Sequence, residues 1–87
     1  MKHIAVASFW DLFNKLPEDI QINAKRLFDL LKINPYHPSL HLKKVNDYWS
    51  IRIGVKYRAI GVQQSDKIIW FWIGKHDDYD KLIKGTH

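Results

Sequence analysis

Apolar residues recur with helical spacing in the first part of the chain. The first series is Phe9, Leu12, Phe13 and Leu16, and the second is Ile20, Ala24, Leu27 and Leu31. Both follow the i, i+3, i+4, i+7 spacing of one helix face, so the pattern predicts a helical hairpin. Ser8 and Asp11 predict a capping box at its start. Pro17 is expected at the first position of the second helix, and Asn34 before Pro35 is expected to end it.

A different pattern begins at Tyr48 and continues to His76. Three short segments rich in Ile, Val, Tyr and Trp are separated by residues 54–56 and 63–66. This composition predicts a three-stranded antiparallel meander. In its first strand the apolar residues Trp49, Ile51 and Ile53 are expected to face the helices, with Tyr48, Ser50 and Arg52 facing away. The third strand is apolar on both faces, which indicates an interior place in the sheet.

The flanking segments complete an α+β fold. The segment from Met1 to Ala7 is either a short strand or an ordered lead-in, because seven residues do not decide the period. Residues 40–45 alternate in polarity and predict a half-buried strand. Leu82 and Ile83 provide apolar contacts for a short C-terminal helix. The turn after Ile53 has no fixed length in the sequence, so the register that places Arg52 and Arg58 stays open.

Composition limits the function classes. The 87 residues predict one domain, 1–87, and 46% of them are hydrophobic, enough for a small core. There is no cysteine, and we see no signal peptide and no apolar run long enough for a bilayer, so we expect a soluble, cytoplasmic protein. The formal net charge of +5 favours a polyanionic partner, namely nucleic acid or an acidic protein segment. The alternative is a basic surface that serves only solubility.

Several short motifs occur in a characteristic order. They are Asn-Pro-Tyr-His-Pro-Ser-Leu at 34–40, a lysine pair at 43–44, Trp-Ser-Ile-Arg-Ile at 49–53, Tyr-Arg-Ala at 57–59 and Trp-Ile-Gly-Lys-His-Asp-Asp-Tyr-Asp at 72–80. Together with the helical hairpin, they resemble the RelE/ParE superfamily of bacterial type II toxin–antitoxin toxins, from Phe9 to Leu82. The resemblance implies a RelE-like fold, with the hairpin on one face of a twisted, mainly antiparallel sheet, and neutralisation by a cognate antitoxin. RelE-like members cut messenger RNA in the ribosomal A site without a metal, and ParE-like members poison DNA gyrase.

The same resemblance implies a site for metal-free RNA cleavage. Arg58 matches the phosphate-binding arginine of RelE-like nucleases, and His76 matches the histidine at the end of the last strand, a general acid or base. Tyr79 would stack on a base or share in proton transfer. The side chains expected to hold the RNA backbone are Lys43, Lys44, Arg52 and Lys56. No cofactor is expected, and the proline between His37 and His41 excludes a regular helical metal pair, so no metal site is expected either.

Each assignment has a structural alternative. The two arginines could pair with Asp47 or Asp66, His76 could cap a helix beside Asp77 and Asp78, the lysines could protect a sheet edge, and Tyr79 could be a packed aromatic. Some relatives place further histidines or an acid where this chain has Arg52 and Lys56, so the catalytic set is incomplete by that pattern. A gyrase-directed toxin and an inactive antitoxin-binding fold therefore remain alternatives to the ribosome-dependent endoribonuclease.

Overall fold

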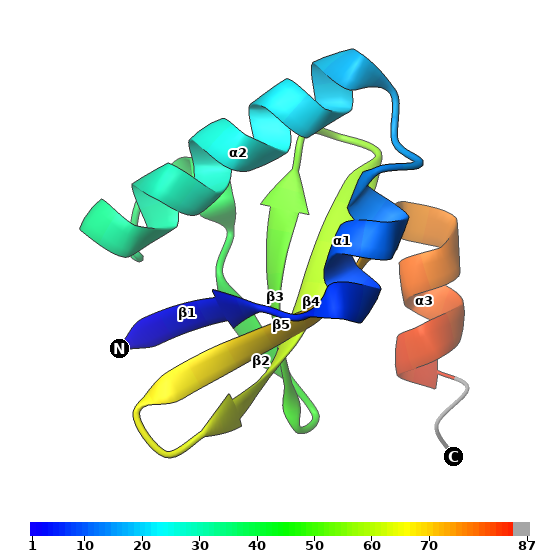
Figure 1. Ribbon diagram of the computed structural model, residues 1–87. Coiled ribbons are helices and arrows are strands. Elements are labelled where there is room, and N and C mark those ends of the chain that lie inside the picture. Colours follow the sequence, from blue (N-terminus) through cyan, green and yellow to red (C-terminus); the bar gives the residue numbers. More distant parts are fainter. Residues whose placement is uncertain (85–87) are drawn as a thin grey trace.

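The computed structural model describes residues 1–84 as one sheet with three α-helices and a short 3₁₀ turn (Figure 1). The expected domain ends at residue 87, and its last three residues lie outside the described part. The elements in chain order are β1 (Lys2–Ala5), α1 (Ala7–Phe13), α2 (Glu18–Ile33), η1 (Pro38–Leu40), β2 (Lys43–Val45), β3 (Tyr48–Ile53), β4 (Tyr57–Gln64), β5 (Lys67–Lys75) and α3 (His76–Lys84).

The sheet has the strand order β1-β5-β4-β3-β2. The meander β3-β4-β5 is antiparallel, as the sequence predicts, and β2 adds to β3 in the same way. The N-terminal segment forms a strand, and it pairs in parallel with β5. This pairing gives β5 a neighbour on each side, which explains why its sequence is apolar on both faces.

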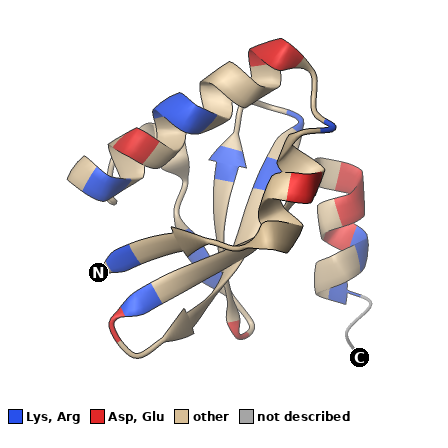
Figure 2. Cartoon of the chain, viewed as in Figure 1, with Lys and Arg blue, Asp and Glu red and all other residues tan. Residues whose placement is uncertain are grey.

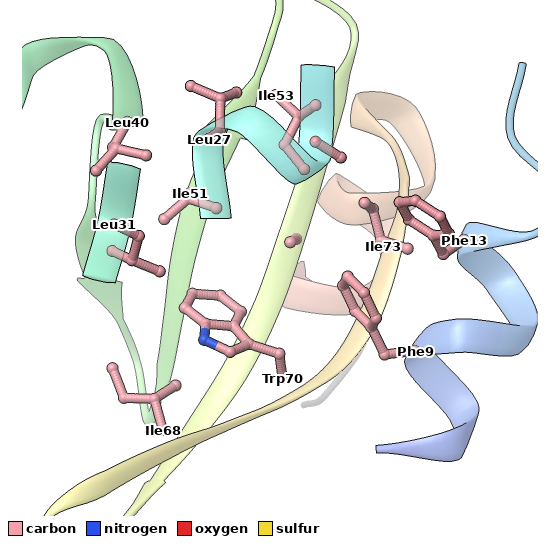
Figure 3. Packing of buried hydrophobic residues seen from close by; sticks show 12 residues of the cluster. Phe9, Phe13, Leu27, Leu31, Leu40, Ile51, Ile53, Ile68, Trp70 and Ile73 are labelled. Atoms are coloured by element: carbon pink, nitrogen blue, oxygen red, sulfur yellow. The ribbon is translucent and has the colours of Figure 1, made fainter. Parts of the chain in front are cut away.

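The hydrophobic core lies between the sheet and the first two helices. Ile51, Ile53 and Trp70 are at most 1% exposed and pack with Leu27 and the other buried residues of α1 and α2 (Figure 3). We call this side of the sheet the inner face. Since side chains alternate along a strand, Tyr48, Ser50 and Arg52 belong to the opposite side, the outer face. The sequence prediction of the two faces of β3 is therefore confirmed.

The outer face is only partly open, which the sequence did not indicate. The Tyr79 hydroxyl of α3 donates a hydrogen bond to the Ser50 hydroxyl of β3, at 3.3 Å between the oxygens. Ser50 is 2% exposed although it faces away from the first two helices. Helix α3 thus covers the middle of the outer face, and both sides of the sheet carry helices.

Three local predictions were wrong. No capping box starts α1, because its N-cap is Val6 and the Ser8 hydroxyl instead donates to the Phe71 carbonyl, at 2.9 Å. Pro17 precedes α2 as its N-cap rather than opening its first turn. The strand expected over 40–45 is confined to Lys43–Val45, since Leu40 ends the 3₁₀ turn and His41 has a positive φ of 46° that breaks an extended strand.

Candidate functional site

Two arginines lie side by side on the outer face. The register of the β3–β4 hairpin places Arg52 directly opposite Arg58. Opposite residues in an antiparallel pair point to the same face, with Cβ atoms about 5 Å apart. Figure 2 shows basic positions on these two neighbouring strands. The register that the sequence left open therefore brings both positive charges together.

Arg58 is buried without a carboxylate partner. It is 8% exposed, and its Nη1 donates to the Tyr57 carbonyl oxygen, at 2.8 Å. Burial lowers the pKa of Arg58 most, and the charge of Arg52 lowers it further, whereas Tyr79 and Asp80 act in the opposite direction. Within residues 1–84 the only side-chain ion pair joins His76 and Asp80, so neither arginine pairs with Asp47 or Asp66. Two cations placed in this way favour an anion between or beside them.

His76 begins α3 directly after β5. Its backbone N–H donates to the Lys56 carbonyl oxygen, at 2.7 Å, which ties the start of α3 to the β3–β4 turn. Its Nδ1 lies 3.5 Å from Oδ2 of Asp80, one turn along the helix, and the imidazole is 43% exposed. Gly74 of β5 stands opposite Arg58, and His76 follows Gly74 by two residues in the chain. The imidazole is therefore accessible to a ligand and has the Asp80 carboxylate close to its Nδ1.

Tyr79 is a buried, packed aromatic residue. It is 6% exposed, its hydroxyl is engaged with Ser50, and its ring lies nearly parallel to that of His76, with 6.1 Å between centroids. A side chain this buried does not offer a face for a nucleobase. Tyr79 instead packs against the sheet, where its hydroxyl connects α3 to β3 and its ring lies beside the imidazole of His76.

The four candidate backbone-binding side chains do not share one surface. Lys43 is paired with Ser50 and therefore lies on the outer face with Arg52, whereas Lys44 is paired with Trp49 and belongs to the inner side. Lys44 is thus separated from the arginines by the sheet. Lys56 lies in the turn before β4 and lines a hollow of about 380 Å³ together with His76, Asp77 and others.

The structure adds residues that the sequence analysis did not select. Asp80 lies 3.5 Å from the His76 ring, and the i, i+4 spacing of these two residues on a helix was a usable signal. Ser50 accepts a hydrogen bond from the Tyr79 hydroxyl, but no sequence pattern connects residues so far apart in the chain. The acidic first turn of α3 contains Asp77 and Asp78, so negative charge borders the cationic site (Figure 2).

Two further observations concern the described residues as a whole. Within residues 1–84, no group of three or more His, Asp and Glu side chains is arranged to hold a metal ion. In the same part of the chain, none of the helices has the length and apolar character needed to span a membrane.

Comparison with known proteins agrees with this architecture. The model of the ParE-like toxin domain family matches residues 18–81. Comparison with curated proteins finds no match. Among solved structures, the RelB–RelE antitoxin–toxin complex from Methanococcus jannaschii contains a chain with a TM-score of 0.72 and 18% identity, over 91% of this chain and 96% of that one.

Two other solved structures are similar. The YoeB/ParE toxin from Agrobacterium tumefaciens has a TM-score of 0.66 and 18% identity, over 87% of this chain and 99% of that one. The isolated E. coli RelE toxin has a TM-score of 0.62 and 14% identity, over 99% and 98%. At these identities the structures show the fold alone, and the family model, which spans most of the chain, shows the family. The protein is a toxin of the RelE/ParE superfamily, with a ParE-like toxin domain.

Proposed function

We propose that this toxin belongs to a type II toxin–antitoxin module and cleaves messenger RNA on the ribosome, in the cytoplasm, without a metal. The observation that supports this function is the pair Arg52 and Arg58 on one face, where no carboxylate of residues 1–84 pairs with either guanidinium. The exposed imidazole of His76 follows two residues after the position opposite Arg58. Cations and a histidine are the groups that a phosphodiester transfer requires.

In the proposed reaction the 2′-hydroxyl oxygen of the RNA attacks the adjacent phosphorus. Its proton goes to a base, the bond from phosphorus to the 5′-oxygen breaks, and that oxygen receives a proton from an acid. The products are a 2′,3′-cyclic phosphate and a 5′-hydroxyl. His76 acts as the acid or the base, and its contact with Asp80 orients the ring.

Arg58 binds the scissile phosphate, and Arg52 adds a second positive charge. Both guanidinium groups stabilise the negative charge that grows on the phosphoryl oxygens in the transition state. Lys43 and Lys56 hold neighbouring phosphates. Tyr79 positions His76 and does not touch the RNA. Lys44 is left out of this proposal, because it lies on the other side of the sheet.

The test is cleavage of a translated message in a purified ribosome system. Wild type is compared with Arg58→Ala and His76→Ala, and the matched controls are Arg26→Ala, on the exposed side of α2, and His41→Asn, which tolerates the positive φ at that position. We expect cuts within the A-site codon that end in a cyclic phosphate. Both site variants should lose at least about 100-fold in rate, and both controls should retain the wild-type rate.

An intact message in the presence of wild-type toxin would contradict the nuclease proposal. A supercoiling assay with DNA gyrase then distinguishes the two alternatives. Inhibited gyrase would establish a gyrase-directed toxin, and active gyrase together with normal growth on expression would indicate a fold that only binds its antitoxin.

We further propose that the antitoxin covers this site with a segment that carries acidic and apolar residues. The unpaired arginines call for carboxylates, and the net charge of +5 favours an acidic partner. In the complex, Arg58 and His76 should become inaccessible. A structure of the complex in which the outer face stays open would contradict this part of the proposal.

A further inference from the structure

Aromatic rings lie on the outer face at the end of β3 opposite to Arg52, with Ser50 and the covering helix α3 between them. The register places Tyr48 of β3 opposite Val62 and Val62 opposite Ile69, so these residues share the face of Arg52 and Arg58. The ring of Phe71 lies beside that of Tyr48, with 5.9 Å between centroids and 57° between planes. Both rings are half-buried, and the remaining surface is open to a ligand.

A break in strand pairing creates this arrangement. Ile60 pairs with Trp72 and the next residue, Gly61, pairs with Trp70, so no residue of β4 stands opposite Phe71 in the register. Phe71 and Trp72 therefore both lie on the outer face, where strict alternation would allow only one of them. The break lies at Gly61, where the inner face is closely packed, since a Cβ at that position would come within 2.6 Å of Ile68 Cγ2.

The indole ring of Trp72 lies closer to Arg58 than the other two rings do along the register of the sheet. A Cβ on Gly74 would lie 2.7 Å from Cζ2 of Trp72, so the indole covers Gly74, the residue opposite Arg58. Half-buried aromatic surface thus begins at Tyr48 and ends next to the phosphate-binding arginine. Lys43 and Arg52 run beside it on the same face.

We propose that Tyr48 and Phe71 form a stacking subsite for one nucleobase of the RNA, on the strand whose scissile phosphate binds Arg58. This inference rests on the proposed function and adds a second contact to it. Aromatic side chains on an open sheet face, interleaved with cations, are the means by which proteins bind unpaired bases. Tyr48 precedes Arg52 by four residues on one strand, about 13 Å at roughly 3.3 Å per residue. The stacked base therefore belongs to a neighbouring nucleotide, not to the one that is cut.

Charge selects RNA over an apolar protein segment as the occupant. Lys43, Arg52 and Arg58 share the face with the rings, and among residues 1–84 no ion pair neutralises them. A phosphate backbone would follow these cations while one of its bases covers the rings. The Tyr48 hydroxyl makes no hydrogen bond within the same part of the chain, so replacing it with hydrogen should cost nothing in binding.

The test uses a short single-stranded RNA with 2′-fluoro substitution throughout, which cannot be cut by its own 2′-oxygen. One base is replaced by 2-aminopurine, whose fluorescence falls when it stacks on an aromatic ring. The position of this base is moved along the RNA, and binding is followed by anisotropy. Wild type is compared with Tyr48→Leu, Tyr48→Phe and the control Tyr36→Leu. Tyr36 is 89% exposed in the loop after α2.

We expect Tyr48→Leu to weaken binding by roughly 5-fold to 100-fold and to remove the fluorescence loss at one position. Leucine keeps an apolar contact with Phe71, so the fold is retained. Tyr48→Phe should equal wild type, because its ring still stacks, and Tyr36→Leu should also equal wild type. An abasic nucleotide at the responsive position should bring wild type down to the affinity of Tyr48→Leu.

Two results would overturn the inference, and they differ from each other. If wild type binds the RNA and Tyr48→Leu binds it equally well with the same fluorescence, the stacking subsite is wrong while the nuclease proposal stands. If wild type binds no RNA even at low salt, the stacking subsite also fails, and the ribosome cleavage assay decides the proposed function separately.

Discussion

Arg58 is a buried charged residue that pairs with no carboxylate among residues 1–84. Taking a charge out of water costs free energy unless a partner compensates, and here burial and Arg52 both oppose the positive charge. Within residues 1–84 its side chain makes one hydrogen bond, to the Tyr57 carbonyl. This combination is poor for stability and suited to binding an anion. An apolar replacement of Arg58 should therefore reduce activity without reducing the free energy of unfolding.

Replacing Arg58 with methionine tests this expectation. Methionine keeps the apolar stem and removes the buried charge, so the free energy of unfolding should stay the same or rise by about 1 kcal/mol. Message cleavage should fall at least about 100-fold. Urea unfolding and the ribosome assay give the two quantities. Arg26→Met on α2 is the control and should change neither. A large loss of stability in Arg58→Met would show that Arg58 supports the fold instead.

Removing the hydroxyl of Tyr79 separates positioning from catalysis. Tyr79→Phe loses the hydrogen bond to Ser50 and keeps the ring beside His76, so unfolding should become easier by about 1 kcal/mol. The cleavage rate should change by less than about threefold, since a positioning ring acts through its shape. Thermal unfolding and the ribosome assay measure both effects. Loss of cleavage in a folded Tyr79→Phe protein would instead support the share in proton transfer that the family resemblance implies.

At the scale of elements, β1 is the part of the fold that the sequence described least. It has four residues and pairs in parallel with β5, far away in the chain. One side-chain hydrogen bond strengthens the pairing: the Trp70 indole N–H donates to His3 Nδ1, at 3.0 Å. Only a neutral imidazole can accept this bond. Burial lowers the pKa of His3 below its ordinary value of 6.5, and the N-terminus and Lys32 lower it further.

This hydrogen bond predicts a specific acid sensitivity. Since the pKa of His3 is lower in the folded chain, the unfolded chain takes up the proton first as pH falls. The stabilisation is complete above about pH 6.5 and is lost as pH falls through the folded-state pKa. Glutamine can accept the indole N–H and does not titrate. His3→Gln should therefore lose less unfolding free energy than wild type between about pH 8 and about pH 5. His41→Asn is the control. Equal losses in wild type and His3→Gln would contradict this account.

The same scale explains what the sequence could and could not predict. Local periodicity was sufficient for α1, α2 and the three strands of the meander, because each buries one regular face. It also placed Ile51 and Ile53 inside. The Arg52–Arg58 pairing depends on the length of a turn, and the burial of Ser50 depends on a helix that follows much later in the chain. Such long-range contacts leave no local signal, so the composition of the site was predicted better than its geometry.

For the whole molecule, the distribution of charge matters more than its total. The net charge of +5 would be compatible with non-specific attraction on all sides. The sheet divides the lysine pair of β2, since Lys43 shares the face of Arg52 and Lys44 shares the side of Trp49. These neighbours have the same charge and the same exposed setting. They therefore form a matched pair that distinguishes a defined RNA surface from general attraction.

The salt dependence of RNA binding gives that distinction quantitatively. Each phosphate contact with a single strand contributes roughly 0.7 to the slope of log affinity against log salt, because the contact releases a counterion. Lys43→Ala and Arg52→Ala should each reduce the slope by about 0.7 and weaken binding at low salt. Lys44→Ala should keep the wild-type slope, although it removes the same charge from the chain. Equal changes in Lys43→Ala and Lys44→Ala would mean that RNA senses only the net charge. A loss confined to Lys43 and Arg52 would place the RNA backbone on the outer face, beside the arginine pair and His76.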